Sequence, residues 1–336
     1  MATDDDSTVA HPRDSFAFEH GEAMDLALFN AYEKGKLHHA WLLTGPQGLG
    51  KASFAYRCAR FLLGHKRDQV YGPLGMAPDD ADVRLVSAQS HPDLLVLERE
   101  VEGGRLKKSI SVEAVREIGL FFSKAPSRSA YRVCIIDSVD DLNLNSANAL
   151  LKILEEPPTK GVIFLISHSP GRLLPTIRSR CRRLSFVPWT DAQVEAFARA
   201  RLPDVGDEDL GRLVRLARGA PGRTLTLMSE GALEIDAFAG RLLERPAPPR
   251  PELAATAATF KANSAKIDGA KRFATFIDCL GERLRERALS AQTPQQGQKL
   301  SELWSRVSGS VGEVEAVNLD RNDYFWSLFN DINEVI

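Results

Sequence analysis

Cysteine is scarce in this sequence and follows no metal-binding or disulfide pattern. Four cysteines stand among 336 residues, Cys58, Cys134, Cys181 and Cys279, and no two form a C-x-x-C pair. This spacing argues against a disulfide framework and against a structural zinc site, and it fits a reducing cytoplasm. We expect Cys58 and Cys181 to pack among other side chains rather than to react.

Long apolar runs, a strong net charge and a signal peptide are also missing. Hydrophobic residues make up 43% of the chain, which supports sizeable cores in two or three domains, but no run approaches a membrane span. The formal net charge of -2 excludes binding to nucleic acid through bulk charge and leaves room for local basic patches. The acidic N-terminus lacks the basic-then-apolar pattern of a secretory signal, and we expect a disordered tail over residues 1–15.

The most specific motif in the sequence is a phosphate-binding loop. A short apolar strand over 40–43 runs into Gly45-Pro46-Gln47-Gly48-Leu49-Gly50-Lys51, and a helix is predicted over 52–63. Strand, G-x-x-x-x-G-K and helix is the order that this motif requires. Backbone N–H groups of the glycine loop and the helix N-terminus attract phosphate oxygens, and Lys51 would neutralise the outer phosphates. The sequence therefore predicts a nucleotide-phosphate site at Gly45, Pro46, Gly48, Leu49, Gly50, Lys51, Ala52 and Ser53.

The residue after Lys51 departs from the motif. A Ser or Thr hydroxyl normally stands there and binds Mg²⁺, whereas this chain has Ala52 and places Ser53 one residue late. One residue along a helix is a rotation of about 100°, so Ser53 cannot simply substitute. We expect phosphate binding to survive and Mg²⁺-dependent chemistry to be weakened.

Two further apolar runs predict buried parallel strands. Residues 133–136 end on Asp137, and residues 162–166 form the second run. Between them the composition favours a helix from residue 145, which Pro157 and Pro158 end. Ligands of open α/β sheets collect at the carboxyl edge of the strands, so Asp137 joins the predicted site.

These runs closely resemble the bacterial clamp-loader ATPases, a branch of the AAA+ family. The resemblance rests on NALLKILEEPP at 148–158 and LLPTIRSRC at 173–181, is thinner over 16–100, and is faint after about residue 240. It implies an α/β P-loop domain with a parallel sheet over 16–188 and an all-α oligomerisation collar over 252–336. Helical patterns predict a three-helix lid over 189–244, and the prolines predict a linker over 245–251.

The residues beyond 188 support this division with helical patterns. Lid helices are predicted over 194–200, over 210–217 and from the glycine loop to residue 228. Collar helices are predicted over 252–289, 298–308 and 322–336. The last of these carries Tyr324, Phe325, Trp326 and Phe329, which we expect in the core and which could also serve oligomerisation.

Two features of the family's N-terminal half differ here. Many relatives carry a four-cysteine zinc module within 64–90, but those cysteines are missing, so we expect no zinc and no other metal. The family has a Pro/Arg stretch near the adenine, and Arg13 is open to that role or to that of a surface anchor.

Further positions of AAA+ motor subunits are altered. The glutamate that orients the attacking water is replaced by Ser138, a poor base at neutral pH, and we expect Asp140 and Asp141 to cap or solvate the next helix. Ser167, His168 and Ser169 lie where a polar sensor is expected, but the alignment slips by one residue, and His168 is interpreted as an ordinary loop histidine.

The lid arginine is also displaced. Arg223 stands one place late relative to the family's Gly-x-x-Arg, so we do not assign it to its own nucleotide. Together with Ala52 and Ser138, this predicts that the chain's own ATP hydrolysis is weak or absent.

Arg180 keeps its family context, because Ser179-Arg180-Cys181 matches the Ser-Arg-Cys motif in full. The resemblance implies that this arginine enters the ATP site of a neighbouring subunit and offsets charge on the γ-phosphate. The alternative is a surface arginine in a basic run, since Arg178, Arg182 and Arg183 are close by.

The favoured interpretation is a non-motor or weak-ATPase subunit of the DNA polymerase III clamp loader. The resemblance implies gamma/tau motor subunits, the delta subunit, the sliding clamp and primed DNA as partners, with ATP or ADP as ligand. Any polymerase activity would belong to the holoenzyme. A competent AAA+ motor that hydrolyses ATP itself and a small-molecule P-loop kinase are the rival hypotheses.

Overall fold

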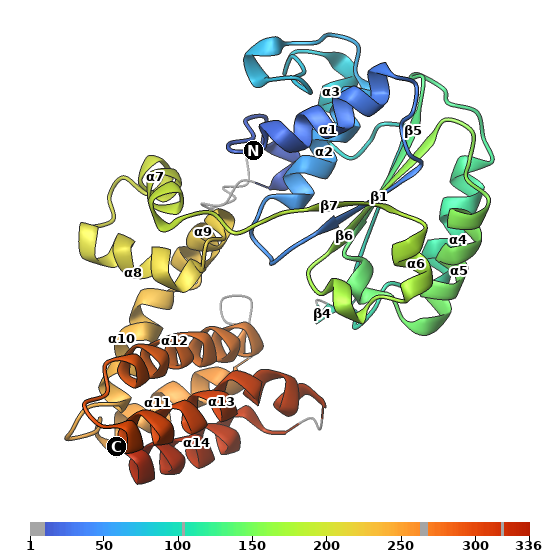
Figure 1. The fold of residues 1–336 in the computed structure, drawn as a ribbon. Helices are drawn as coiled ribbons and strands as arrows, with labels where there is room; N and C mark the ends of the chain where they lie inside the picture. The colour runs from blue at the N-terminus through green and yellow to red at the C-terminus, as the bar shows by residue number, and fades with distance from the viewer. Residues whose placement is uncertain (1–10, 103–104, 263–267, 317–318) are drawn as a thin grey trace, which may run out of the picture. The chain divides into compact units, whose positions relative to one another are not determined.

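The computed structural model describes residues 11–102, 105–262, 268–316 and 319–336. The chain divides at Trp189 and Thr190 into an α/β unit and an all-helical unit (Figure 1). The α/β unit confirms the predicted fold class. In the described part of the chain, no helix is both long enough and apolar enough to cross a membrane.

A five-stranded parallel sheet forms the centre of the α/β unit, in the order β2-β5-β6-β1-β7. Its strands are β1 (Ala40–Thr44), β2 (Leu94–Glu98), β5 (Arg132–Asp137), β6 (Gly161–Ser167) and β7 (Arg182–Ser185). β1 and β6 are buried along their whole length, as their apolar runs predict. The parallel register sets Thr44 beside Ser167 and Asp137 beside Ile166, so the carboxyl ends of the three central strands meet at one edge.

Helices cover both faces of this sheet (Figure 1). α1 (Glu22–Glu33), α2 (Lys51–Leu63) and α3 (Ala81–Ser87) lie on one side. α4 (Val112–Phe122), α5 (Leu144–Glu155) and α6 (Pro175–Ser179) lie on the other and share a core with alternate strand residues such as Leu42, Ile136 and Leu165. Cys58 is fully buried on α2, as predicted.

Short elements connect these layers. They are the 3-10 helices η1 (Pro12–Asp14), η2 (Gln69–Tyr71), η3 (Val139–Asp141) and η4 (Pro170–Arg172), and a hairpin of β3 (Val101–Glu102) and β4 (Arg105–Leu106). Of the predicted disordered tail over 1–15, residues 1–10 lie outside the described residues. Residues 11–15 contain η1 and contact α2, so this end of the prediction is wrong. The buried Arg60 of α2 donates to the carbonyls of Arg13 (2.6 Å) and Ser15.

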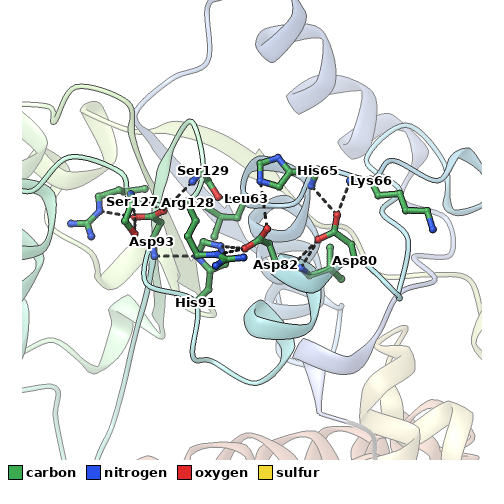
Figure 2. A network of polar contacts seen from close by, with 12 residues as sticks. Leu63, His65, Lys66, Asp80, Asp82, His91, Asp93, Ser127, Arg128 and Ser129 are labelled. Atoms are coloured by element: carbon green, nitrogen blue, oxygen red, sulfur yellow. Dashed lines mark hydrogen bonds and ion pairs between the residues drawn. The ribbon is translucent and has the colours of Figure 1, made fainter.

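A buried carboxylate holds the segment over 64–80, where the family's cysteines are missing. Asp80 accepts N–H bonds from His65 (3.0 Å) and Lys66 (2.7 Å) with one oxygen, and from Asp82 (2.8 Å) and Val83 (3.1 Å) with the other (Figure 2). It therefore caps α3, which the sequence patterns missed, and ties the start of the segment to its end.

A second carboxylate in the same network, Asp93, binds the backbone of the residues that precede β5. Asp93 is completely buried and accepts backbone N–H bonds from Ser127, Arg128 and Ser129 at 2.8 to 3.1 Å (Figure 2). Arg132 adds a side-chain bond at 3.2 Å. A buried charge needs such partners, and here backbone groups supply most of them.

The helical unit has more helices than the sequence predicts. It contains α7 (Asp191–Arg201), α8 (Asp207–Ala217), α9 (Pro221–Ser229), α10 (Ala232–Leu242), α11 (Arg250–Lys261), α12 (Gly269–Leu289), α13 (Pro294–Ala316) and α14 (Arg321–Val335).

Thr190 caps α7 with a capping box to Gln193. α10 was not predicted, the predicted helix over 252–289 is two helices, and α13 is longer at both ends than the predicted 298–308. α11 begins inside the predicted linker, with Pro251 in its first turn, where proline is tolerated.

Aromatic rings form the core of the helical unit. Phe325 of α14 lies 6.2 Å from Phe238 of α10, 5.7 Å from Phe260 of α11 and 5.6 Å from Phe276 of α12, between ring centroids. The expectation of a core role holds for Phe325, which is 1% exposed, while Trp326 is half-buried. α10, whose residues fall in the predicted lid, thus shares one core with helices of the predicted collar.

Candidate functional site

The phosphate-loop motif lies between β1 and α2, as predicted. Gly45, Gly48 and Gly50 have φ values of +142°, +83° and +79°, a range that disfavours residues with a Cβ. A Cβ on Gly45 would also approach the carbonyl oxygen of Phe186 to 2.5 Å. The loop therefore requires glycine for both its conformation and its packing.

Lys51 begins α2 and is almost fully buried, with 3% of its surface exposed. Its Nζ donates to the carbonyl oxygens of Gly45 and Pro46, each at 2.6 Å. Burial lowers the pKa of Lys51 to about 8, against the attraction of Asp137 and Asp140. The lysine is held at the loop and is available to phosphates only if it exchanges these carbonyl bonds for new ones.

Asp137 ends β5 at the same edge of the sheet. Burial and the nearby Glu98 carboxylate raise the pKa of Asp137 to about 6, while Lys51 opposes the shift. The structure therefore brings Lys51 and Asp137 close together at this edge of the sheet, and their predicted contact with nucleotide stays a prediction.

The donor set fits phosphates better than a metal. The glycine loop, the start of α2 and Lys51 can hold phosphate oxygens, whereas Ala52 gives only a methyl group beside Lys51. Within the described residues, no three His, Cys, Asp or Glu side chains are placed to hold a metal ion. Ser53, the residue after Ala52 in α2, is half-buried. Its predicted contact with nucleotide stays a prediction.

Asp140 and Asp141 do not cap the next helix, so the capping part of the expectation for these two acids is wrong. Asn143 caps α5 instead, accepting from the N–H of Ser146 at 3.0 Å. Asp140 turns back to β6 and accepts from the Ser167 hydroxyl at 2.8 Å and from the His168 N–H. It thereby joins the ends of two neighbouring strands.

Ser138 and Asp141 form a local pair beside the site. The Ser138 hydroxyl donates to Asp141 at 3.3 Å, and Arg99 lies 3.2 Å from the same carboxylate. Asp141 is thus held by an arginine, away from the role of the missing glutamate. A serine hydroxyl in this setting gives no general base at neutral pH.

His168 follows β6 and differs from an ordinary loop histidine. Its Nδ1 is buried and has no hydrogen-bond partner among the described residues. Burial and the neighbouring Lys51 charge lower the pKa of His168. The proximity of His168 to Lys51 depends on the pairing of β6 with β1, which no local sequence pattern encodes.

Arg180 stands at the C-terminal end of α6 and is partly accessible. Its side chain is 35% exposed, and one Nη donates to the Thr176 carbonyl at 3.1 Å. The other Nη donates to Glu155 Oε1 at 2.7 Å. Glu155, the last residue of α5, was not singled out by the sequence patterns, since α5 and α6 are distant along the chain.

Arg223, the displaced lid arginine, is occupied within the helical unit. It forms an ion pair with Asp278 of α12. In the α/β unit, the two basic residues that follow Cys181 also have contacts: Arg182 stacks over Trp41 at 4.8 Å, and Arg183 donates to the Thr44 hydroxyl at 3.1 Å. Of these, Arg183 lies next to the start of the phosphate loop.

Sequence comparison places this site in a known family. Residues 22–190 match the family model described as DNA polymerase III, delta subunit. The chain is 39% identical over 197 residues to DNA polymerase III subunit delta' of Pseudomonas aeruginosa, covering 58% of this chain and 57% of that protein. It is 32% identical over 200 residues to the Escherichia coli delta' subunit, covering 60% and 57%. The chain thus spans less than two thirds of the length of these relatives.

More distant similarities extend to a gamma/tau subunit and to a solved structure. DNA polymerase III subunit gamma/tau of Mycobacterium tuberculosis is 31% identical over 206 residues, covering 60% of this chain and 34% of that protein. A gamma subunit-related protein of Thermotoga maritima has a TM-score of 0.47 and 18% identity, covering 91% and 99%, a similarity too low to argue from. The family model, the delta' relatives and the α/β AAA+-type fold agree: the chain belongs to the DNA polymerase III delta' subunit family of clamp-loader proteins.

Proposed function

We propose that this chain is a non-motor or weak-ATPase subunit that supplies Arg180 to the ATP site of a neighbouring clamp-loader subunit. The observation that carries the proposal is a contrast within the α/β unit. Arg180 is accessible at the end of α6 within a complete Ser-Arg-Cys run, while the chain's own loop lacks the magnesium hydroxyl at Ala52 and the water-orienting acid at Ser138.

The loop itself would hold ATP or ADP without turning it over efficiently. Gly45, Gly48 and Gly50 with Lys51 supply the phosphate-binding groups, and Asp137 is the one family acid retained at the edge. Bound Mg²⁺ would neutralise phosphate charge and orient the oxygens, but Ala52 cannot ligate it. Nucleotide at this loop would therefore stabilise the fold rather than drive a cycle.

The partners follow from the family. We propose that the chain assembles with gamma/tau motor subunits and the delta subunit, and that the complex loads the sliding clamp onto primed DNA. The similarity to gamma/tau sequences supports a shared architecture with the motors. Residues 252–336, with half-buried rings at Trp326 and Phe329, would serve the contact between subunits.

A competent motor is the second candidate, and one observation favours it. Lys51 and Asp137 are both present and meet at the same sheet edge, as hydrolysis requires. Against it stand Ala52, Ser138 and the engagement of Arg223 by Asp278.

Steady-state turnover separates the two candidates. The purified chain alone should hydrolyse ATP far below the ordinary enzyme range of roughly 1–10³ s⁻¹. Mixed with its motor partners, clamp and primed DNA, it should raise their turnover. A rate near 1 s⁻¹ or faster for the chain alone would favour the motor.

A further inference from the structure

The last residue of α5, Glu155, lies where it can control the geometry of Arg180. Glu155 Oε1 accepts from Nη2 of Arg180 at 2.7 Å, and the Thr176 carbonyl accepts from Nη1 at 3.1 Å. Two donors on the two arms of the guanidinium are thus fixed by groups from different elements. A long side chain with many rotamers is held in one place.

The backbone that carries Glu155 and the backbone that carries Arg180 are both anchored in the buried core. Leu154 and Ile177, next to Glu155 and three residues before Arg180, are 2% and 1% exposed and belong to one apolar cluster. The ring of His39 lies 3.2 Å from the Leu154 carbonyl and holds the end of α5. The carboxylate is therefore presented from a rigid position, although it is itself on the surface.

The contact is also easy to release. The side chain of Arg180 is 35% exposed and that of Glu155 is 50% exposed. An ion pair so open to water adds little to stability, so it does not compete strongly with a polyphosphate for the guanidinium. It fits a contact that orients the arginine more than one that locks it.

We propose that Glu155 is a positioning residue, which holds Arg180 in a defined orientation for a phosphate group presented by a neighbouring subunit. This rests on the function proposed above for Arg180. Glu155 itself touches neither nucleotide nor reacting atoms in this scheme. By restricting the rotamers of Arg180 before the subunits meet, Glu155 reduces the side-chain entropy that is lost when the site forms. This favours the productive geometry.

The test is ATP turnover by the reconstituted complex of motor subunits with this chain, in the presence of clamp and primed DNA. Glu155→Ala should lower kcat by about 3- to 10-fold with an unchanged KM for ATP, because orientation is lost but the charge of Arg180 remains. Glu155→Gln, which keeps an acceptor oxygen, should lose less. Glu156→Ala is the matched control, an exposed acid one residue on that does not contact Arg180 in the structure.

A double-mutant cycle distinguishes positioning from a general structural effect. In an Arg180→Ala background, Glu155→Ala should have no further effect on kcat, since its only route is through the arginine. An additive loss there would overturn the proposal, as would a rise in rate for Glu155→Ala alone or equality with Glu156→Ala. If Arg180→Ala itself leaves turnover unchanged, the proposed function of Arg180 is wrong. If Arg180→Ala lowers turnover but Glu155→Ala does not, only the positioning role of Glu155 is wrong.

Discussion

Two charged residues at the loop edge, Lys51 and Asp137, are held at a cost in folding free energy. Burial lowers the pKa of Lys51 to about 8 and raises that of Asp137 to about 6. Both shifts disfavour the charged form that each group has near neutral pH. Such unfavourable burial is typical of sites retained for binding rather than for stability.

Asp137→Asn should therefore stabilise the protein above pH 6. A folded pKa above the unfolded value means that the native state binds more protons between about pH 4 and pH 6. Wild-type stability then falls as pH rises through that window and is flat above it. The variant should gain about 1–2 kcal/mol in unfolding free energy at pH 7.5, and the gain should vanish toward pH 4. Urea unfolding of both proteins from pH 4 to pH 8 checks this. A gain that does not change with pH would show that charge burial is not its cause.

At the level of residues, the sequence predicted the positions of side chains that belong to a motif. It did not predict contacts between residues far apart along the chain. The loop glycines, Lys51 and Asp137 fall where strand and motif place them. The turn of Asp140 back to Ser167 and the contact of Glu155 with Arg180 join residues 27 and 25 positions apart. No local pattern encodes such contacts, because they arise from strand order and helix packing.

Among the elements, the segment over 64–80 depends on one carboxylate. Asp80 is 8% exposed and accepts four backbone N–H bonds. Asp80→Ala should cost about 2–4 kcal/mol, because it removes a helix cap and leaves buried donors unpaired. It should also speed amide exchange over 64–83.

The neighbouring acid is the control for this change. Asp79 has a side chain 60% exposed and pairs with Lys66 at 2.6 Å. Asp79→Ala should change the unfolding free energy far less than Asp80→Ala does, because an ion pair open to water adds little to stability. Equal losses for the two variants would contradict the special role of Asp80.

The helical unit depends on a buried ion network. Asp236 of α10, 2% exposed, accepts two bonds from Arg212 of α8 at 2.7 Å each and two from Arg283 of α12 at 2.5 and 3.0 Å. Asp236→Ala should cost about 3–5 kcal/mol, since it strands buried arginine charge. Glu234→Ala on the same helix, with its side chain 81% exposed, should cost little. Thermal unfolding of both variants checks this, and a small loss for Asp236→Ala would show that water replaces the carboxylate.

The elements were predicted well where caps and periodicity agree. The three central strands of the sheet fall on the apolar runs over 40–43, 133–136 and 162–166, and α2 follows the phosphate-loop motif as predicted. The helix over 252–289 was predicted as one because its composition stays helical throughout, and composition alone does not reveal where a helix ends. α10 was missed because it follows α9 closely, through a single glycine in the left-handed region, Gly231.

At the scale of the whole molecule, the structure changes which truncated forms of the chain are expected to stay folded. The predicted boundary before residue 252 would separate Phe238 and Asp236 from their partners on α12 and α14. A protein ending at residue 189 should unfold cooperatively, since the sheet and its helices are complete. A protein ending at residue 250 should keep that transition but leave 191–242 unprotected in amide exchange. Full protection of those helices would contradict the shared core.

The central claim, that Arg180 acts in a neighbouring subunit's ATP site, has a direct test. Steady-state ATP hydrolysis is measured for reconstituted complexes, with clamp and primed DNA, that differ only at this residue. Arginine fingers are worth roughly 10³ to 10⁵ in rate at a single site, and a complex with several sites should lose less. Arg180→Ala should lower turnover with assembly intact, Arg180→Lys should rescue little because an ammonium lacks the planar fork, and the exposed Arg178→Ala should match the wild type. Equal turnover for wild type and Arg180→Ala, in complexes shown to be assembled, would contradict the account.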